Sequence, residues 1–95
     1  MDILQENYIN PQLSYVLIAD MLDMNPVYLS HSFKQQAGEG ISVCLERIRL
    51  KKSIELLEQG MKIIDIAQAV GYANPKTYSR AFKRIYGINP TNYKQ

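Results

Sequence analysis

Apolar residues recur along this chain three or four positions apart, the spacing that places them on one side of an α-helix. Alternating apolar and polar runs of the kind that form strands are missing at useful length. The breaks between helical stretches fall at glycines and at Asn-Pro pairs, which are typical of helix ends and helix starts. The pattern predicts an all-α fold of about seven helices: 2–8, a helix capped by Ser14, 26–38, 42–59, 63–70, 75–87 and 90–93.

Apolar positions indicate which sides of two of these helices face the core. In the helix that follows Ser14, the inward positions are predicted at Val16, Leu17, Met21 and Leu22. The longest helix opens at Ser42, and its apolar positions are Leu45, Ile48, Ile54, Leu56 and Leu57. About 17 residues at 1.5 Å each make this helix roughly 25 Å long. It can therefore serve as a rod between two smaller units.

Two segments nearly repeat each other: NPVYLSHSFK at 25–34 and NPKTYSRAFK at 74–83. An Ile-Ala pair precedes each segment, at 18–19 and 66–67, and a glycine, Gly38 or Gly87, follows it. The Asn-Pro pairs are 49 residues apart and the Ile-Ala pairs 48, so the second copy has a connection one residue longer. A short helix, a tight turn and a second helix form each copy, which is the helix-turn-helix arrangement.

The second helix of each copy has an inner and an outer face. Leu29 and Phe33 share the inner face in the first copy, as Tyr78 and Phe82 do in the second. The outer faces carry Val27, Ser30, His31 and Lys34 in the first copy, and Lys76, Ser79, Arg80 and Lys83 in the second. Such an outer face can enter a DNA major groove.

The net charge of +2 is unevenly distributed. Residues 1–65 carry six basic and nine acidic residues, whereas residues 66–95 carry five basic residues and no acidic one. A basic segment of this kind favours a polyanionic partner, although on charge alone a solvated basic face is an equal alternative. Solvated faces are also expected for Asp20, Asp23, Glu46, Glu55 and Glu58, the last two of which could instead border a partner surface.

The outer faces carry side chains suited to the reading of base pairs. Contacts to base edges are assigned to Val27, Ser30, His31, Lys76, Ser79 and Arg80. The planar guanidinium of Arg80 can pair with O6 and N7 of guanine, and Val27 can pack on a thymine methyl. Contacts to phosphates are assigned to Lys34, Lys83, Arg84 and the helix N-termini near Ser14 and Thr77.

Residues spread over the whole chain match a known pattern. They are Leu13-Ser14, Ile18-Ala19, Tyr28-Leu29-Ser30, Phe33-Lys34, Gly38, Arg47, Leu56-Leu57, Ile66-Ala67, Val70-Gly71-Tyr72, the block from Tyr78 to Arg84, Gly87, Pro90 and Tyr93. In these residues the chain closely resembles the DNA-binding domain of the AraC/XylS (arabinose-operon regulator) family of bacterial transcription factors. It departs from that pattern at His31, where an arginine is common, and at Lys62, where a serine or threonine usually caps the helix.

The resemblance implies one DNA-binding domain over 1–95, with helix-turn-helix subdomains at 1–40 and 61–95 joined by a linker helix at 41–60. It implies sequence-specific binding of double-stranded DNA by two recognition helices in successive major grooves, which regulates transcription. RNA polymerase is an expected partner. Family members usually carry a separate effector-binding or receiver domain, which is expected here as a fused N-terminal part. No cofactor is implied.

Other functions find less support in the sequence. His31 lies beside no nucleophile or carboxylate, and Cys44 has no second thiol, so neither an enzyme nor a metal site is expected. No apolar run is long enough for a membrane span, and a lone cysteine fits a cytoplasmic location. Tyrosines could stack on single-stranded bases, but packing is favoured for Tyr28, Tyr72, Tyr78 and Tyr86. A helical protein-interaction module that has lost DNA binding remains the alternative.

Overall fold

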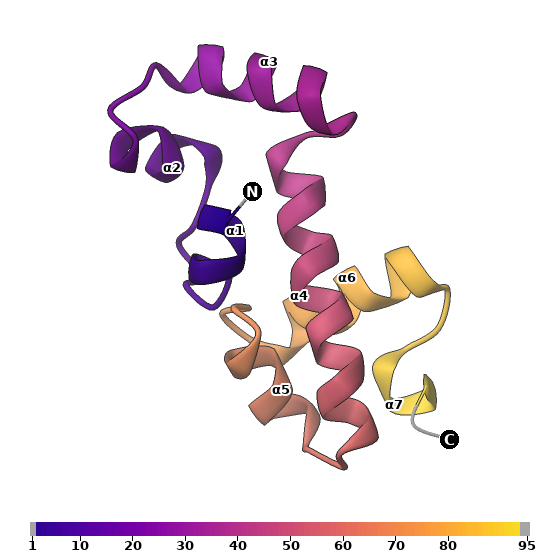
Figure 1. The fold of residues 1–95 in the computed structure, drawn as a ribbon. Coiled ribbons are helices and arrows are strands. Elements are labelled where there is room, and N and C mark those ends of the chain that lie inside the picture. Colours follow the sequence, from indigo (N-terminus) through magenta and orange to yellow (C-terminus); the bar gives the residue numbers. More distant parts are fainter. Residues whose placement is uncertain (1, 94–95) are drawn as a thin grey trace.

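The computed structural model describes residues 2–93, which contain seven helices and no strand (Figure 1). The helices are α1 (Asp2–Asn7), α2 (Tyr15–Met21), α3 (Pro26–Ala37), α4 (Ile41–Glu58), α5 (Ile63–Ala69), α6 (Pro75–Tyr86) and α7 (Pro90–Tyr93). The all-α prediction is confirmed. The longest helix, α4, begins at Ile41 rather than Ser42, and its N-cap Gly40 offers no side chain for a capping hydrogen bond.

Equivalent caps start the second helix of each repeat. The Asn25 side-chain oxygen accepts hydrogen bonds from the backbone N–H groups of Val27 and Tyr28, at 2.9 and 3.1 Å. The Asn74 side-chain oxygen accepts one from the backbone N–H of Thr77 at 2.9 Å. Each such cap contributes about 1 kcal/mol to stability. By contrast, Lys62 at the start of α5 makes no capping hydrogen bond, as the residue type predicts.

The turns inside the two repeats also correspond. Asp23 and Gly71, 48 positions apart, both have a left-handed backbone, with φ of 55° and 102°. At the far ends of α3 and α6, Gly38 and Gly87 adopt nearly the same left-handed conformation, with φ of 80° and 81°. The two copies therefore share left-handed residues at corresponding places, which shows that the sequence repeat is also a structural one.

Two hydrophobic clusters hold the helices together. The first consists of Leu4, Leu13, Ile18, Ala19, Leu29, Phe33, Ile41 and Leu45. The second consists of Leu50, Leu57, Ile66, Ala67, Val70, Tyr72, Tyr78, Ala81 and Phe82. Helix α4 contributes to both, and Tyr8 packs against both from the segment that follows α1. Each large apolar side chain buried in this way contributes about 1.5–3 kcal/mol, which fixes the rotation of α3 and α6 about their axes.

The predicted inward face of α2 is wrong at three of its four positions. Val16, Met21 and Leu22 are all exposed, whereas Ile18 and Ala19 are fully buried. Residues two positions apart lie about 200° apart around a helix, so Val16 cannot face the core together with Ile18. Met21 and Leu22 lie where the helix ends and the turn to α3 begins.

Of the four tyrosines predicted to pack, Tyr72 and Tyr78 are buried, and Tyr86 packs against Phe82 although it is 38% exposed. Tyr78 and Phe82 have ring centroids 5.9 Å apart, Tyr72 lies 5.7 Å from Tyr78, and Tyr86 lies 4.7 Å from Phe82. The prediction is wrong for Tyr28, whose side chain is 64% exposed. Its place on α3 is next to the outer face and not on the face that carries Leu29 and Phe33.

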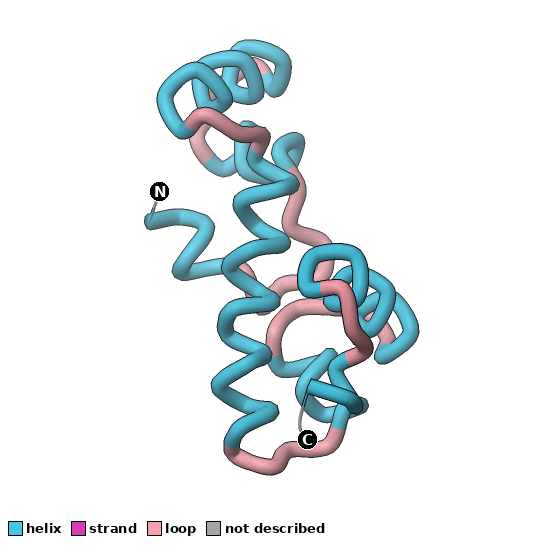
Figure 2. Tube along the Cα trace, turned by 90° about the vertical axis from the view of Figure 1, so that its right-hand side faces the viewer, coloured by secondary structure: helices cyan, strands magenta, loops and turns pink. Residues whose placement is uncertain are grey.

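The molecule is elongated, with extents of 43 × 21 × 20 Å. Helices α3 and α6 run in the same direction across α4 (Figure 1). Helix α3 lies at the N-terminal end of α4, and α6 passes behind the middle of α4. Figure 2 views both of them nearly end-on, and it shows α1 on one side of α4 and α6 on the other. Helices α3 and α6, each the second helix of its repeat, are thus roughly parallel and are separated along the long axis of the molecule.

A buried arginine lies where the two halves meet. The Arg49 side chain donates hydrogen bonds to the backbone oxygens of Tyr8 and Asn10, both at 2.8 Å. Its guanidinium carbon lies 5.4 Å from the centroid of the Tyr72 ring. Burial lowers the pKa of Arg49, while Tyr72 and Glu46 act in the opposite direction. The sequence patterns had not singled out this residue.

Gly71 leaves the space that this junction needs. A Cβ atom at this position would lie 2.2 Å from the Tyr8 carbonyl oxygen and 2.8 Å from the Arg49 Nε. The first of these neighbours is backbone, which cannot move without shifting the chain. Glycine is therefore required both by the left-handed backbone and by the close approach of the two halves.

Replacement of Gly71 by alanine should lower the free energy of unfolding by more than about 2 kcal/mol. Left-handed strain of about 1–2 kcal/mol would add to the clash with the Tyr8 carbonyl. Gly60→Ala is the matched control, because Gly60 has a φ of 85° and open space where its Cβ would lie. Urea unfolding measures both variants. Equal losses would contradict the close packing at Gly71.

Because Tyr72 is buried, the free energy of unfolding should depend on pH in the alkaline range. Burial raises the pKa of Tyr72 to about 12, Glu46 adds to the rise, and Arg49 and Arg84 oppose it. A tyrosine in the unfolded chain titrates near pH 10, so the unfolded state loses this proton first. The contribution of protonated Tyr72 is therefore complete below about pH 10 and is lost as the pH rises from about 10 to 12.

Tyr72→Phe should leave the free energy of unfolding at pH 7 unchanged or slightly raised. The hydroxyl that it removes is buried and has no hydrogen-bond partner within residues 2–93. The variant should also lose about 2 kcal/mol less stability than the wild type between pH 10 and 12. Denaturant unfolding at a series of pH values tests this, with the exposed Tyr28→Phe as control. Identical alkaline profiles for Tyr72→Phe and the wild type would contradict the assignment.

Candidate nucleic-acid interface

The outer face of α3 is open to solvent along its length. Val27 is 72% exposed, His31 and Lys34 are exposed, and Ser30 is half-buried. These four side chains line an open hollow of about 330 Å³ together with Tyr15, the first residue of α2. The structure thus brings the predicted first-copy residues together. It adds Tyr15, which the sequence could not place because it belongs to a different helix.

The outer face of α6 carries exposed cations. Lys76, Arg80 and Lys83 are exposed and Ser79 is half-buried between them and the core. The ion pairs formed within residues 2–93 include none of these three cations. Their charges are therefore available to a polyanion. The predicted inner and outer faces of both helices are those that the structure shows.

The residues assigned to phosphates differ in what else they contact. The Ser14 hydroxyl oxygen accepts a hydrogen bond from the Leu17 N–H at 3.3 Å, so it caps α2. The Thr77 hydroxyl donates to the side-chain oxygen of Asn74 at 3.0 Å, next to the cap of α6. Lys34 and Lys83 lie in the last turns of α3 and α6. Their charges favour these helix ends as well as an anion outside.

Arg84 is not free in this structure. Its guanidinium forms an ion pair with the Glu46 carboxylate, which joins α6 to α4. The hydrogen bond and the charge of Glu46 raise the pKa of Arg84. The expectation that Glu46 lies on a solvated face is therefore wrong, since its side chain is 23% exposed and paired. Partners 38 residues apart leave no local pattern in the sequence.

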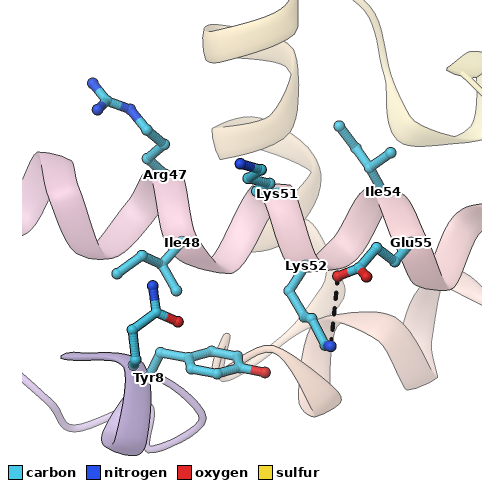
Figure 3. A pocket seen from close by; sticks show the side chains of 8 residues that line it. Tyr8, Arg47, Ile48, Lys51, Lys52, Ile54 and Glu55 are labelled. Atoms are coloured by element: carbon cyan, nitrogen blue, oxygen red, sulfur yellow. Dashed lines mark ion pairs between the residues drawn. The ribbon is translucent and has the colours of Figure 1, made fainter. Parts of the chain in front are cut away.

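A second hollow, of about 970 Å³, lies between α1 and α4 (Figure 3). Tyr8 faces α4 across it, and Lys52 forms an ion pair with Glu55 at 3.5 Å. Basic residues also border it, of which Arg47 is paired with Glu39. None of the residues assigned to DNA lines this hollow, and α1 lies on the other side of α4 from α6 (Figure 2).

Two helix-turn-helix units on one central helix, each presenting an open second helix, define a DNA-binding domain of the double helix-turn-helix type. A family model described as a helix-turn-helix domain matches residues 18–95. With this match and the similar structures below, the chain belongs to the AraC/XylS family of DNA-binding domains, which serve in transcription regulation.

Three similar proteins illustrate the relationship. The C-terminal domain of AraT, a response regulator from Geobacillus stearothermophilus, has 34% identity and a TM-score of 0.95, over 98% of this chain and 78% of that one. The uncharacterized transcriptional regulatory protein YesN of Bacillus subtilis is 37% identical over 90% of this chain and 24% of its own length. The DNA-binding domain of AdpA, solved with a target DNA, has 21% identity and a TM-score of 0.86, over 94% of this chain and 80% of that one, which shows the fold alone.

The chain spans about a quarter of the length of YesN. Among residues 2–93, no helix combines the length and the apolar character needed to cross a lipid bilayer.

Glu46→Gln should raise the affinity for DNA, because it removes a negative charge beside α6 and releases Arg84. The plot of log affinity against log salt should steepen by about 0.9 if Arg84 then neutralises one more phosphate. The free energy of unfolding should change by less than about 1 kcal/mol, because the arginine of the pair is largely exposed.

Glu55→Gln is the matched control for Glu46→Gln. Glu55 also lies on α4 and also pairs with a cation, but it borders the hollow on the side of α1. Fluorescence anisotropy titrations at several salt concentrations compare the two variants. An equal rise in both would mean that net charge, and not the release of Arg84, causes the effect.

Proposed function

We propose that the chain binds double-stranded DNA by placing α3 and α6 in two successive turns of the major groove. The observation that carries this proposal is the pair of equivalently capped helices that run in the same direction with their polar faces open. Successive major-groove turns are about 34 Å apart. The molecule is 43 Å long, and α3 and α6 are separated along this long axis.

Base recognition would differ between the two helices. On α6, Arg80 would pair with O6 and N7 of a guanine, with Lys76 and Ser79 beside it. On α3, the side chains offered to base edges are Val27, Ser30 and His31. Because the two faces differ in residue type, the DNA site should be asymmetric.

Contacts to the DNA backbone would set the register. Lys34 and Lys83 supply charges that are unpaired within residues 2–93, Arg84 would supply another on leaving Glu46, and the N-termini of α2 and α6 near Ser14 and Thr77 supply backbone N–H groups. About five neutralised phosphates would give a slope near −4 to −5 in a plot of log affinity against log salt. The proposed function needs no cofactor and no catalytic group.

A regulator of transcription also needs protein partners. We assign RNA polymerase and a fused N-terminal receiver or effector domain to this role, in a cytoplasmic protein. Such a fusion is supported by AraT, a response regulator in which the similar domain is the C-terminal one. The hollow between α1 and α4 is a surface separate from the DNA-facing residues, and its border includes Glu55. This separation would allow a partner and DNA to bind together.

Arg80→Ala should weaken binding to the preferred site by about 1–3 kcal/mol and relax the preference at one base pair. Lys83→Ala should weaken binding to all sequences alike, because a phosphate contact carries no sequence information. Selection of bound sites from a random duplex pool, followed by titration of the recovered site, measures both effects.

Two results would count against the proposal. If Arg80→Ala kept both affinity and base preference, the outer face of α6 would not read bases. If the selection recovered no enriched motif from the wild-type chain, the alternative of a protein-interaction module would be favoured.

A further inference from the structure

The hollow between α2 and α3 has apolar walls at a place where a base edge would lie. From this we infer that the hollow receives the 5-methyl group of a pyrimidine, with Tyr15 and Val27 as its walls. The inference rests on the proposed function, because it concerns the half-site that α3 would read. It adds Tyr15 to the residues that determine specificity.

The two wall residues are available for such a contact. Val27 is 72% exposed and Tyr15 is 40% exposed, so water covers much of their apolar surface in the free protein. Both line the same open hollow of about 330 Å³, which has room for a pyrimidine edge. A methyl group that enters it would remove apolar surface from water on both sides, and this is favourable in proportion to the area buried.

The second copy has different chemistry at the corresponding positions. With the offsets of 48 and 49 residues, Ile63 corresponds to Tyr15 and Lys76 to Val27. Ile63 packs against the second core cluster, and Lys76 places a cation where the first copy has a valine. The hollow with apolar walls is therefore a property of the first copy and not of the repeat. It follows that α3 reads a methyl group where α6 reads hydrogen-bond acceptors.

Polar groups at the same hollow can orient the base. The Ser30 hydroxyl can donate to O4 of thymine, or accept from the amino group of 5-methylcytosine. The Ser30 hydroxyl can therefore hydrogen-bond to either base. The feature of both bases that the hollow would recognise is their common 5-methyl group. Lys34 lies one further turn along the outer face of α3, and a phosphate contact is assigned to it.

The test removes single methyl groups from the DNA. Starting from the site recovered by selection, each thymine is replaced in turn by deoxyuridine, which differs only by the 5-methyl group. For the wild-type chain, at least one replacement should weaken binding about fourfold, the factor that corresponds to burial of one such group. Val27→Ala and Tyr15→Ala should abolish the difference between thymine and deoxyuridine at that position, whereas Tyr15→Phe should keep it.

Val16→Ala is the matched control for Val27→Ala. Val16 is 52% exposed and lies on α2 next to Tyr15, but it is not among the residues that line the hollow. This variant should keep the full sensitivity to the methyl group. Circular dichroism confirms that each variant is folded, which is expected since all the changed side chains are partly or largely exposed.

Two further duplexes, with cytosine or 5-methylcytosine at the sensitive position, distinguish the source of the methyl group. Weaker binding of cytosine that methylation restores would support the subsite. Tighter binding of thymine than of 5-methylcytosine would assign thymine, and the reverse order would assign 5-methylcytosine.

Failure of the inference is distinguishable from failure of the proposed function. If a motif is recovered and Arg80→Ala weakens it, but no deoxyuridine replacement has an effect, DNA reading stands and the methyl subsite is overturned. The subsite is also overturned if Val27→Ala keeps the methyl sensitivity. If no motif is recovered, both fall together.

Discussion

The hydrogen bonds of one buried cation, Arg49, hold the two halves of the molecule in a fixed relation. A guanidinium removed from water costs several kcal/mol unless its N–H groups find acceptors. Arg49 finds them in the carbonyl groups of Tyr8 and Asn10, which precede the first repeat, while Tyr72 of the second repeat covers its face. Because Arg49 projects from the middle of α4, the segments before and after this helix are tied to it at one point, and Gly71 leaves the room for their approach.

This junction holds together two repeats whose outer faces differ in chemistry. Each unit has its own apolar cluster and its own capped second helix, so each could present a surface alone. In the proposed function, this fixed relation would make the two surfaces one extended DNA interface, in which α6 supplies positive charge and α3 supplies an apolar and hydroxyl-bearing face. Glu46 adds a second tie between α4 and α6 through Arg84, at the edge of the DNA-facing surface. The pair that helps to fix the orientation of α6 therefore lies next to the cations that would set the affinity for DNA.

The sequence predicted the features that depend on local spacing. Helix starts at Asn25 and Asn74, helix ends at Gly38 and Gly87, and the two faces of α3 and α6 follow from contacts within a few residues, and all appear in the structure. Features that depend on distant partners were not predicted. Arg49 binds carbonyl groups 39 and 41 residues away, which side-chain patterns do not reveal. The exposure of Val16 and Tyr28 was missed because a helix buries only the side that its neighbours cover, and these two residues lie off that side.

The common direction of α3 and α6 has a consequence for the geometry of a promoter. If α3 and α6 enter successive grooves as proposed, their relation by translation, and not by a twofold axis, would give the bound protein a head and a tail along the duplex. A palindrome offers no advantage to such a molecule, and a single copy on its operator points either upstream or downstream. Inverting the operator in place would turn the protein end for end and exchange the surfaces that it offers to the transcription start.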